Sequence, residues 1–259
     1  MRGPLLILIV WLATNSSSRV RAEEPWVATR TMGLFEVRSE FALEDVESQR
    51  IMTQIEGLQT DVLTHLNLTA GEQSVEVNLF RSQSTYRAFL SSRVPEGMNR
   101  PALFVQGTDY GRVYVYRRRG FDTDLRHECT HAVLHNALPY VPMWIDEGLA
   151  EYFEPPREQR SAGNPHLASL RRSIFFGWKP NLARLEQAEN LSDMGAAEYR
   201  EAWAWAHFLL NGPADARQVL SDYLYDISEG ETAGSFQTRL LERVPDAERQ
   251  LVNHIRLWR

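Results

Sequence analysis

The sequence predicts an α+β fold, in which a small mixed α/β lobe is followed by a mainly helical lobe. Residues 26–118 contain short segments of alternating apolar residues, interrupted by two amphipathic helical stretches. From Phe121 onward, apolar residues recur at helical spacing, and prolines separate the periodic segments. A chain of 259 residues is also long enough to bury a sizeable core. We therefore predict a mixed lobe over 23–120 and a helical lobe over 121–259.

The first lobe is predicted from five segments. Residues 26–41 are rich in β-branched residues and predict one or two strands. Residues 44–67 space their apolar side chains three or four apart, which predicts an amphipathic helix. Residues 74–80 alternate as a strand does, and residues 82–94 begin with capping residues and predict a short helix. Residues 102–118 predict a hairpin that turns at Asp109-Tyr110-Gly111.

The second lobe is predicted to be helical throughout. Prolines punctuate its central part, and two others stand where helices begin. The expected helices are 123–137, 143–154, 165–175, 196–211, 213–227, 232–243 and 246–257.

The first 22 residues are typical of a secretory signal peptide. Arg2 gives a positive start, an apolar run follows, and Val20-Arg21-Ala22 resembles a cleavage site. The apolar run is shorter than the roughly 18 residues that span a bilayer. We expect an exported protein, periplasmic or secreted, with no stable membrane insertion after cleavage. An uncleaved anchor is the alternative.

The charge of the chain argues against nucleic acid as a partner. The net charge is −6, and removal of Arg2, Arg19 and Arg21 with the signal peptide lowers it to −9. The single cysteine, Cys129, cannot form an internal disulfide and is expected in the core.

The segment "HECTH" matches the pattern H-E-x-x-H, which predicts a metal site. Asp122 or Thr123 can cap the helix, so His127 and His131 are expected on one helical face, one turn apart. Two imidazoles in this arrangement can bind one Zn²⁺. Glu128 lies beside that face and is placed to take a proton from an activated water.

A catalytic zinc needs a third protein ligand and one open position. His135 lies about 12 Å along the helix from His127, which is too far to share an ion. Cys129 is rotated to the far side of the helix. Glu147, in "WIDEGLAEYFE", is the better candidate, since fifteen residues with two prolines separate it from His131. We expect one zinc per chain.

Glu151 follows Glu147 by four residues and shares its face of the predicted helix. A carboxylate there can accept the remaining N–H of a zinc-bound histidine and so fix its tautomer. We therefore predict a supporting role for Glu151 in the outer shell of the metal site.

"HECTH" followed at this spacing by "WIDEGLAEYFE" resembles the gluzincin metallopeptidases, the peptidase MA-like group. The match is specific over 127–154, and the whole chain resembles uncharacterised exported bacterial members. The resemblance implies a zincin-like fold, His127, His131 and Glu147 as zinc ligands, and Glu128 as general base. The chain lacks a G-x-M-E-N phrase, which argues against the large aminopeptidases of that group.

The resemblance further implies a donor for the transition-state oxyanion on a later helix. "EYREAWAWAHFLL" offers Tyr199, and His207 eight residues on; Tyr199 is the predicted catalytic residue and His207 the alternative. The expected function is an exported zinc metallopeptidase acting on a peptide or protein. One strand of the hairpin at 102–118 is the candidate edge for the substrate. A zincin-like binding module without activity is the alternative from another class, and a structural zinc site is a third.

Overall fold

The computed structural model describes residues 25–160 and 166–258. These residues form two compact units. The first comprises the described residues up to Asp61 together with Ala70–Asn136, and the second comprises Val62–Thr69 and the residues from Ala137 onward. A mixed sheet comes first in the chain and a mainly helical region follows, so the predicted two-lobe α+β fold is confirmed.

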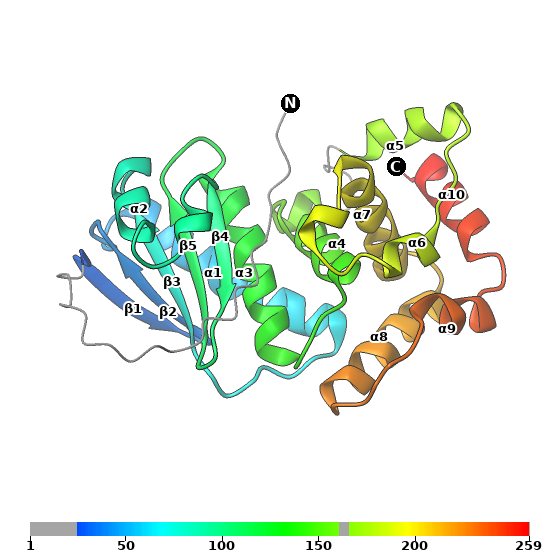
Figure 1. Cartoon of the computed structure of the whole chain (residues 1–259), viewed down its shortest axis with the longest axis horizontal. Coiled ribbons are helices and arrows are strands. Elements are labelled where there is room, and N and C mark those ends of the chain that lie inside the picture. Colours follow the sequence, from blue (N-terminus) through cyan, green and yellow to red (C-terminus); the bar gives the residue numbers. More distant parts are fainter. Residues whose placement is uncertain (1–24, 161–165, 259) are drawn as a thin grey trace. The chain divides into compact units, whose positions relative to one another are not determined.

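The first unit is built on one mixed sheet (Figure 1). Within the described residues the sheet has five strands, in the order β1-β2-β3-β5-β4. They are β1 (Ala28–Met32), β2 (Phe35–Ser39), β3 (Val75–Phe80), β4 (Ala102–Gln106) and β5 (Gly111–Tyr116). The central pairs β2–β3 and β3–β5 are parallel, and the outer pairs β1–β2 and β4–β5 are antiparallel. The predicted stretch at 26–41 therefore forms two strands.

The hairpin of β4 and β5 places β4 at an edge of the sheet. Gln106 pairs with Gly111, and the backbone N–H of Gly107 donates to Tyr110 O across the turn. The hairpin predicted at 102–118 is thus confirmed. Because β4 pairs only with β5 among the described strands, it forms one edge of the sheet.

Helices of the first unit lie on the two faces of this sheet. They are α1 (Val46–Leu66), whose residues from Val62 onward belong to the second unit, α2 (Gln83–Leu90) and α3 (Phe121–Ala137), with a short 3-10 helix η1 (Pro95–Gly97). Leu103 and Val105 pack in one buried cluster with Leu90 of α2. Phe104 points to the opposite face, since strand side chains alternate, and its ring contacts His131 and His135 of α3.

The second unit is helical throughout its described residues. Its elements are α4 (Met143–Phe153), η2 (Arg157–Gln159), α5 (His166–Phe175), α6 (Leu182–Glu186), η3 (Leu191–Asp193), α7 (Ala196–Asn211), α8 (Ala214–Ser228), α9 (Phe236–Arg243) and α10 (Ala247–Leu257). The most extensive helix–helix contact of this unit joins α4 and α7. Trp203 and Trp205 of α7 are fully buried.

Two local predictions were wrong. The helix α3 begins at Phe121, so Asp122 and Thr123 lie inside its first turn and neither is its N-cap. Asp122 pairs instead with Arg50 of α1. The helix expected at 232 begins only at Phe236, because Gly234 has φ +70° and Ser235 caps the helix by accepting from the backbone N–H of Thr238. The short helix α6 was not predicted.

The predicted signal peptide, residues 1–22, lies outside the described residues. In the part of the chain that the structure describes, no helix combines the length and the apolar character needed to cross a bilayer.

Candidate metal centre

The helix α3 presents its two motif histidines one turn apart. His127 and His131 have ring centroids 4.8 Å apart, and both side chains are buried. Four residues of helix bring side chains onto the same face, which is the arrangement that the spacing of "HECTH" predicts. The two imidazoles are therefore neighbours through local geometry alone.

Glu128 lies between them in the sequence, and its carboxyl group is buried with only 1% of the residue exposed. The pKa of Glu128 is raised to about 7, chiefly because the carboxyl group is buried; His127 and a hydrogen bond from the Phe104 backbone lower the pKa, and Asp124 raises it, but burial has the largest effect. Oε2 of Glu128 has no hydrogen-bond partner among the described residues. A buried carboxylate of this kind is poised to take or hold a proton near neutral pH.

The edge strand β4 runs beside this carboxylate. The Phe104 backbone supplies a hydrogen bond to Glu128, and the Phe104 ring is stacked near His131 with 6.4 Å between ring centroids. Phe104 pairs with Val113 of β5 in the ladder. The edge strand β4 therefore adjoins the motif helix within the first unit.

In the second unit, Glu147 is held in place by the contact between α4 and α7. Gly148 permits this contact, because a Cβ at Gly148 would lie 2.5 Å from Ala202 O and 3.3 Å from Ala206 Cβ. Tyr199, one turn before Trp203 on α7, donates from Oη to Oε1 of Glu147 at 3.3 Å. Glu147 is fully buried and Tyr199 nearly so.

One ligand atom each of His127, His131 and Glu147 lies within 4.8 Å of the other two. All three residues are buried. Imidazole nitrogens and a carboxylate oxygen are donors that divalent metals bind in proteins. The three residues thus form a group that could hold a metal ion.

No protein-family model and no curated protein matches this chain.

Glu151 has a partner that the sequence did not suggest. Oε2 of Glu151 and Nε2 of His166, the first residue of α5, form a short hydrogen-bonded pair. The ring of His166 lies 5.9 Å from that of Trp203. His166 belongs to no motif in the sequence, so only the tertiary structure reveals its contact with Glu151, which lies one helical turn beyond Glu147 along α4. The predicted role of Glu151 beside a zinc-bound histidine stays a prediction.

The remaining candidates are placed as follows. His207 is fully buried, and its Nδ1 lies 2.8 Å from Nε2 of His254 on α10. His135 packs its ring against Phe104, with 5.5 Å between centroids. Cys129 is fully buried and free, as predicted, and burial raises the pKa of its thiol. Tyr199, the predicted oxyanion donor, contacts the metal-binding group through its hydrogen bond to Glu147.

Proposed function

We propose that the chain is an exported, zinc-dependent metallopeptidase. The observation that carries this proposal is the convergence of one ligand atom each from His127, His131 and Glu147 to within 4.8 Å. The resemblance of "HECTH" and "WIDEGLAEYFE" to the gluzincin peptidases supports the same function. So does the signal-like start of the sequence, which suits a peptidase that acts outside the cytoplasm.

The donor set fits zinc in both chemistry and size. Zinc binds histidine nitrogen and carboxylate oxygen at about 2.0–2.2 Å, so two ligand atoms on one tetrahedral ion lie about 3.3–3.6 Å apart. The observed limit of 4.8 Å is longer than that by about 1.2–1.5 Å, so the three side chains must draw together by rotation when they bind the ion. Structural zinc sites use four protein ligands and favour cysteine, whereas catalytic sites use three and keep one position open. Three ligands without cysteine favour the catalytic class.

Zinc bound there would polarise the peptide carbonyl and make the attacking water more acidic. Glu128 is the residue that receives the proton of that water as its oxygen bonds to the carbonyl carbon. Burial raises the pKa of Glu128, which makes its carboxylate a stronger base for this proton. Glu128 then passes the proton to the leaving amine as the C–N bond breaks. The other product is the free carboxyl group of the cleaved peptide.

The substrate would lie along the edge strand β4. An extended peptide can add to a sheet edge through backbone hydrogen bonds, and this binding mode keeps the bound peptide in a β-strand conformation. The Phe104 backbone of β4 hydrogen bonds to Glu128, so a peptide on this edge would pass close to the general base. This supports cleavage of extended, unstructured segments rather than of folded domains.

The alternative is a zincin-like module that binds a partner without cleaving it. The retained glutamate at position 128 favours the enzyme, since a module that only binds has no use for a buried general base. Its Oε2 atom has no hydrogen-bond partner among the described side chains, which is costly unless a water or substrate contacts it.

Two measurements test the proposal. Purified mature protein should contain about one zinc per chain by elemental analysis, and should cleave casein. Glu128→Gln should retain the zinc and lose at least about 10³-fold in kcat/KM, because the base is removed while the ligands remain. Glu158→Gln, an exposed substitution, is the matched control and should cleave as wild type does.

The ligands are tested separately. Glu147→Ala should lose the zinc, while His135→Ala should keep it, because His135 is not part of the metal-binding group. Full activity of Glu128→Gln would refute the mechanism. A zinc-loaded wild type that cleaves nothing would favour the binding module.

A further inference from the structure

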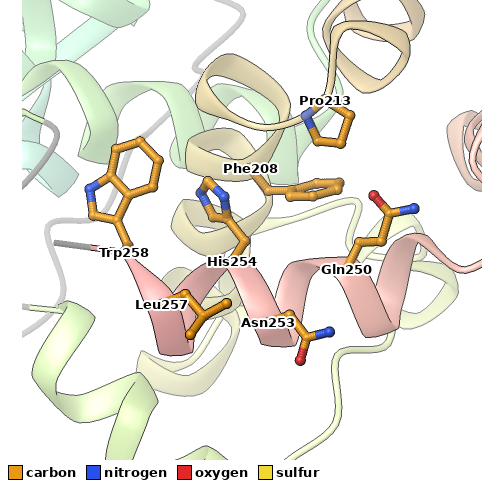
Figure 2. A pocket seen from close by; sticks show the side chains of 7 residues that line it. All are labelled: Phe208, Pro213, Gln250, Asn253, His254, Leu257 and Trp258. Carbon is orange, nitrogen blue, oxygen red and sulfur yellow. The ribbon is translucent and has the colours of Figure 1, made fainter.

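A pocket of about 550 Å³ opens in the second unit, and none of the metal-binding residues lines it (Figure 2). The carboxyl-terminal part of α7 forms one wall through Phe208, and Pro213, at the start of α8, extends that wall. The helix α10 forms the other wall with side chains one turn apart, among them Gln250 and His254. Its size falls within the range of about 300–1,000 Å³ that is usual for small-molecule sites.

The lining of this pocket carries no Lys, Arg, Asp or Glu side chain among the described residues. His254 is neutral near pH 7, because burial lowers its pKa to about 4. A phosphate, a carboxylate or an ammonium group would therefore find no opposite charge on the walls. This excludes nucleotides, acidic sugars and free amino acids as good ligands, and favours a neutral one.

One side of the pocket is aromatic. Figure 2 shows Phe208 and Trp258 on either side of His254. The ring of His254 lies 5.5 Å from that of Phe208 and 4.7 Å from that of Trp258. Phe208 is buried beneath His254, whereas His254 and Trp258 are half-buried, so Trp258 is the aromatic side chain on which a flat apolar face can lie.

The other side offers hydrogen-bonding groups that both donate and accept. Gln250 donates from Nε2 to Asp246 Oδ1 at 2.7 Å, which leaves its Oε1 as an acceptor. Asn253 is exposed, and its amide supplies both a donor and an acceptor. Such groups suit hydroxyls, which themselves donate and accept.

His254 adds a polar atom whose role can change. Its Nε2 lies 2.8 Å from Nδ1 of the buried His207, so one of these two nitrogens donates to the other. In both cases Nδ1 of His254 stays available to a ligand. It carries a proton and donates when His207 donates to Nε2, and it accepts when Nε2 donates to His207. Nδ1 makes no hydrogen bond to any described residue. The pair holds the imidazole ring in place and lets it adapt to a hydroxyl of either orientation.

We propose that this pocket binds a neutral saccharide unit. A pyranose has an apolar C–H face that packs on an aromatic ring, and an edge of hydroxyls that need both donors and acceptors. The pocket offers these two surfaces side by side. An acyl chain would match the aromatic side but would offer no hydrogen-bonding group to Gln250 Oε1, to the Asn253 amide or to His254 Nδ1, and displacing water from these atoms without replacing its hydrogen bonds costs free energy.

The test is ligand-observed NMR with the full mature chain. The probes are cellobiose, maltose and N,N′-diacetylchitobiose, with decanoate and glucuronate as the apolar and anionic comparisons. We expect at least one neutral disaccharide to bind with a dissociation constant in about the millimolar range. Decanoate and glucuronate should bind at least about tenfold more weakly.

Variants locate the binding. Trp258→Ala and Asn253→Ala should each weaken the disaccharide by about fivefold or more, because one removes the stacking surface and the other an amide. Arg256→Ala, an exposed change on α10 outside the lining, is the matched control and should bind as wild type does. Asn253 is exposed, so its replacement keeps the test valid if Trp258→Ala does not fold.

Three results would overturn the proposal: no disaccharide of the set binds, decanoate binds more tightly than all of them, or both pocket variants bind as wild type does. The test does not involve zinc or hydrolysis, so it stands apart from the proposed peptidase activity.

Discussion

Tyr199 donates a hydrogen bond from Oη to Oε1 of Glu147, and the two oxygens lie 3.3 Å apart. This relationship ties the candidate oxyanion donor to the candidate zinc ligand. A group that hydrogen bonds to a ligating carboxylate orients it and tunes its basicity. Tyr199 is therefore a positioning residue for Glu147, and its catalytic role on the substrate stays a prediction.

Tyr199→Phe should weaken zinc binding by about 10–100-fold, the usual effect of losing a partner of a metal ligand. The measurement is competition for zinc against a chromophoric chelator, followed by assay of casein cleavage at saturating zinc. If activity returns fully at saturating zinc, Tyr199 acts only through Glu147. A remaining loss of about 10²-fold or more in kcat/KM would show that it also stabilises the oxyanion. Unchanged zinc affinity would contradict the positioning role.

Gly148→Ala should destabilise the protein by about 2–4 kcal/mol. The new Cβ would lie 2.5 Å from the backbone oxygen of Ala202, so α4 and α7 must move apart. The same movement pulls Glu147 from Tyr199, so zinc affinity should fall as well. Urea denaturation measures the free energy of unfolding.

Gly57→Ala is the matched control for this substitution. Gly57 lies in the interior of α1 with no atom within 4 Å of the added Cβ. Alanine is the better helix former, so this change should raise the free energy of unfolding by about 0.5–1 kcal/mol. Equal effects of the two substitutions would show that the α4–α7 contact does not depend on the missing Cβ.

The sequence predicts local features of this fold better than contacts between distant segments, and the α4–α7 contact at Gly148 illustrates the difference. His127 and His131 are neighbours because of helical spacing, which is local and can be read from the motif. The hairpin of β4 and β5 is likewise a local feature. The approach of α4 to α7 at Gly148 is not, because it depends on residues more than fifty positions apart.

Features without a local pattern were missed for the same reason. The pair of Glu151 and His166 joins two helices, and no periodicity connects a lone histidine to a carboxylate fifteen residues earlier. The helix α6 has five residues, too few to establish a period of 3.6. The partner of His207 is His254, 47 residues away on α10.

His254 should make the stability of the protein depend on pH. Burial lowers the pKa of His254 to about 4 from 6.5, so between these values the unfolded chain binds a proton that the folded protein excludes. The contribution of neutral His254 to the free energy of unfolding should therefore be greatest above about pH 6.5 and should fall as the pH drops towards 4. Since the ring is partly exposed, we expect a loss of about 1–2 kcal/mol rather than the full value of about 3.

Urea denaturation at several pH values between 4 and 7 measures this loss. His254→Gln cannot take up the proton, so its curve against pH should be flatter than that of the wild type by that amount. The rings of His207, Phe208 and Trp258 pack against that of His254. Parallel curves for the two proteins would contradict the assignment of the proton to His254.

Removal of zinc should lower the thermal stability of the protein without unfolding it. A ligand that binds only the folded state stabilises it by about 2.7 kcal/mol at a concentration of 100 times its Kd. For a chain of this size we expect Tm to fall by several degrees when a chelator removes the metal. Because the buried sheet of the first unit and the buried tryptophans of α7 do not depend on an ion, the fold should persist in the metal-free protein.

Glu147→Ala should abolish the zinc-dependent change in Tm, whereas Glu158→Ala, at an exposed position, should preserve it. If zinc stabilised Glu147→Ala as much as the wild type, the ion would bind elsewhere in the protein. The proposed hydrolysis would then lose the metal centre on which it depends.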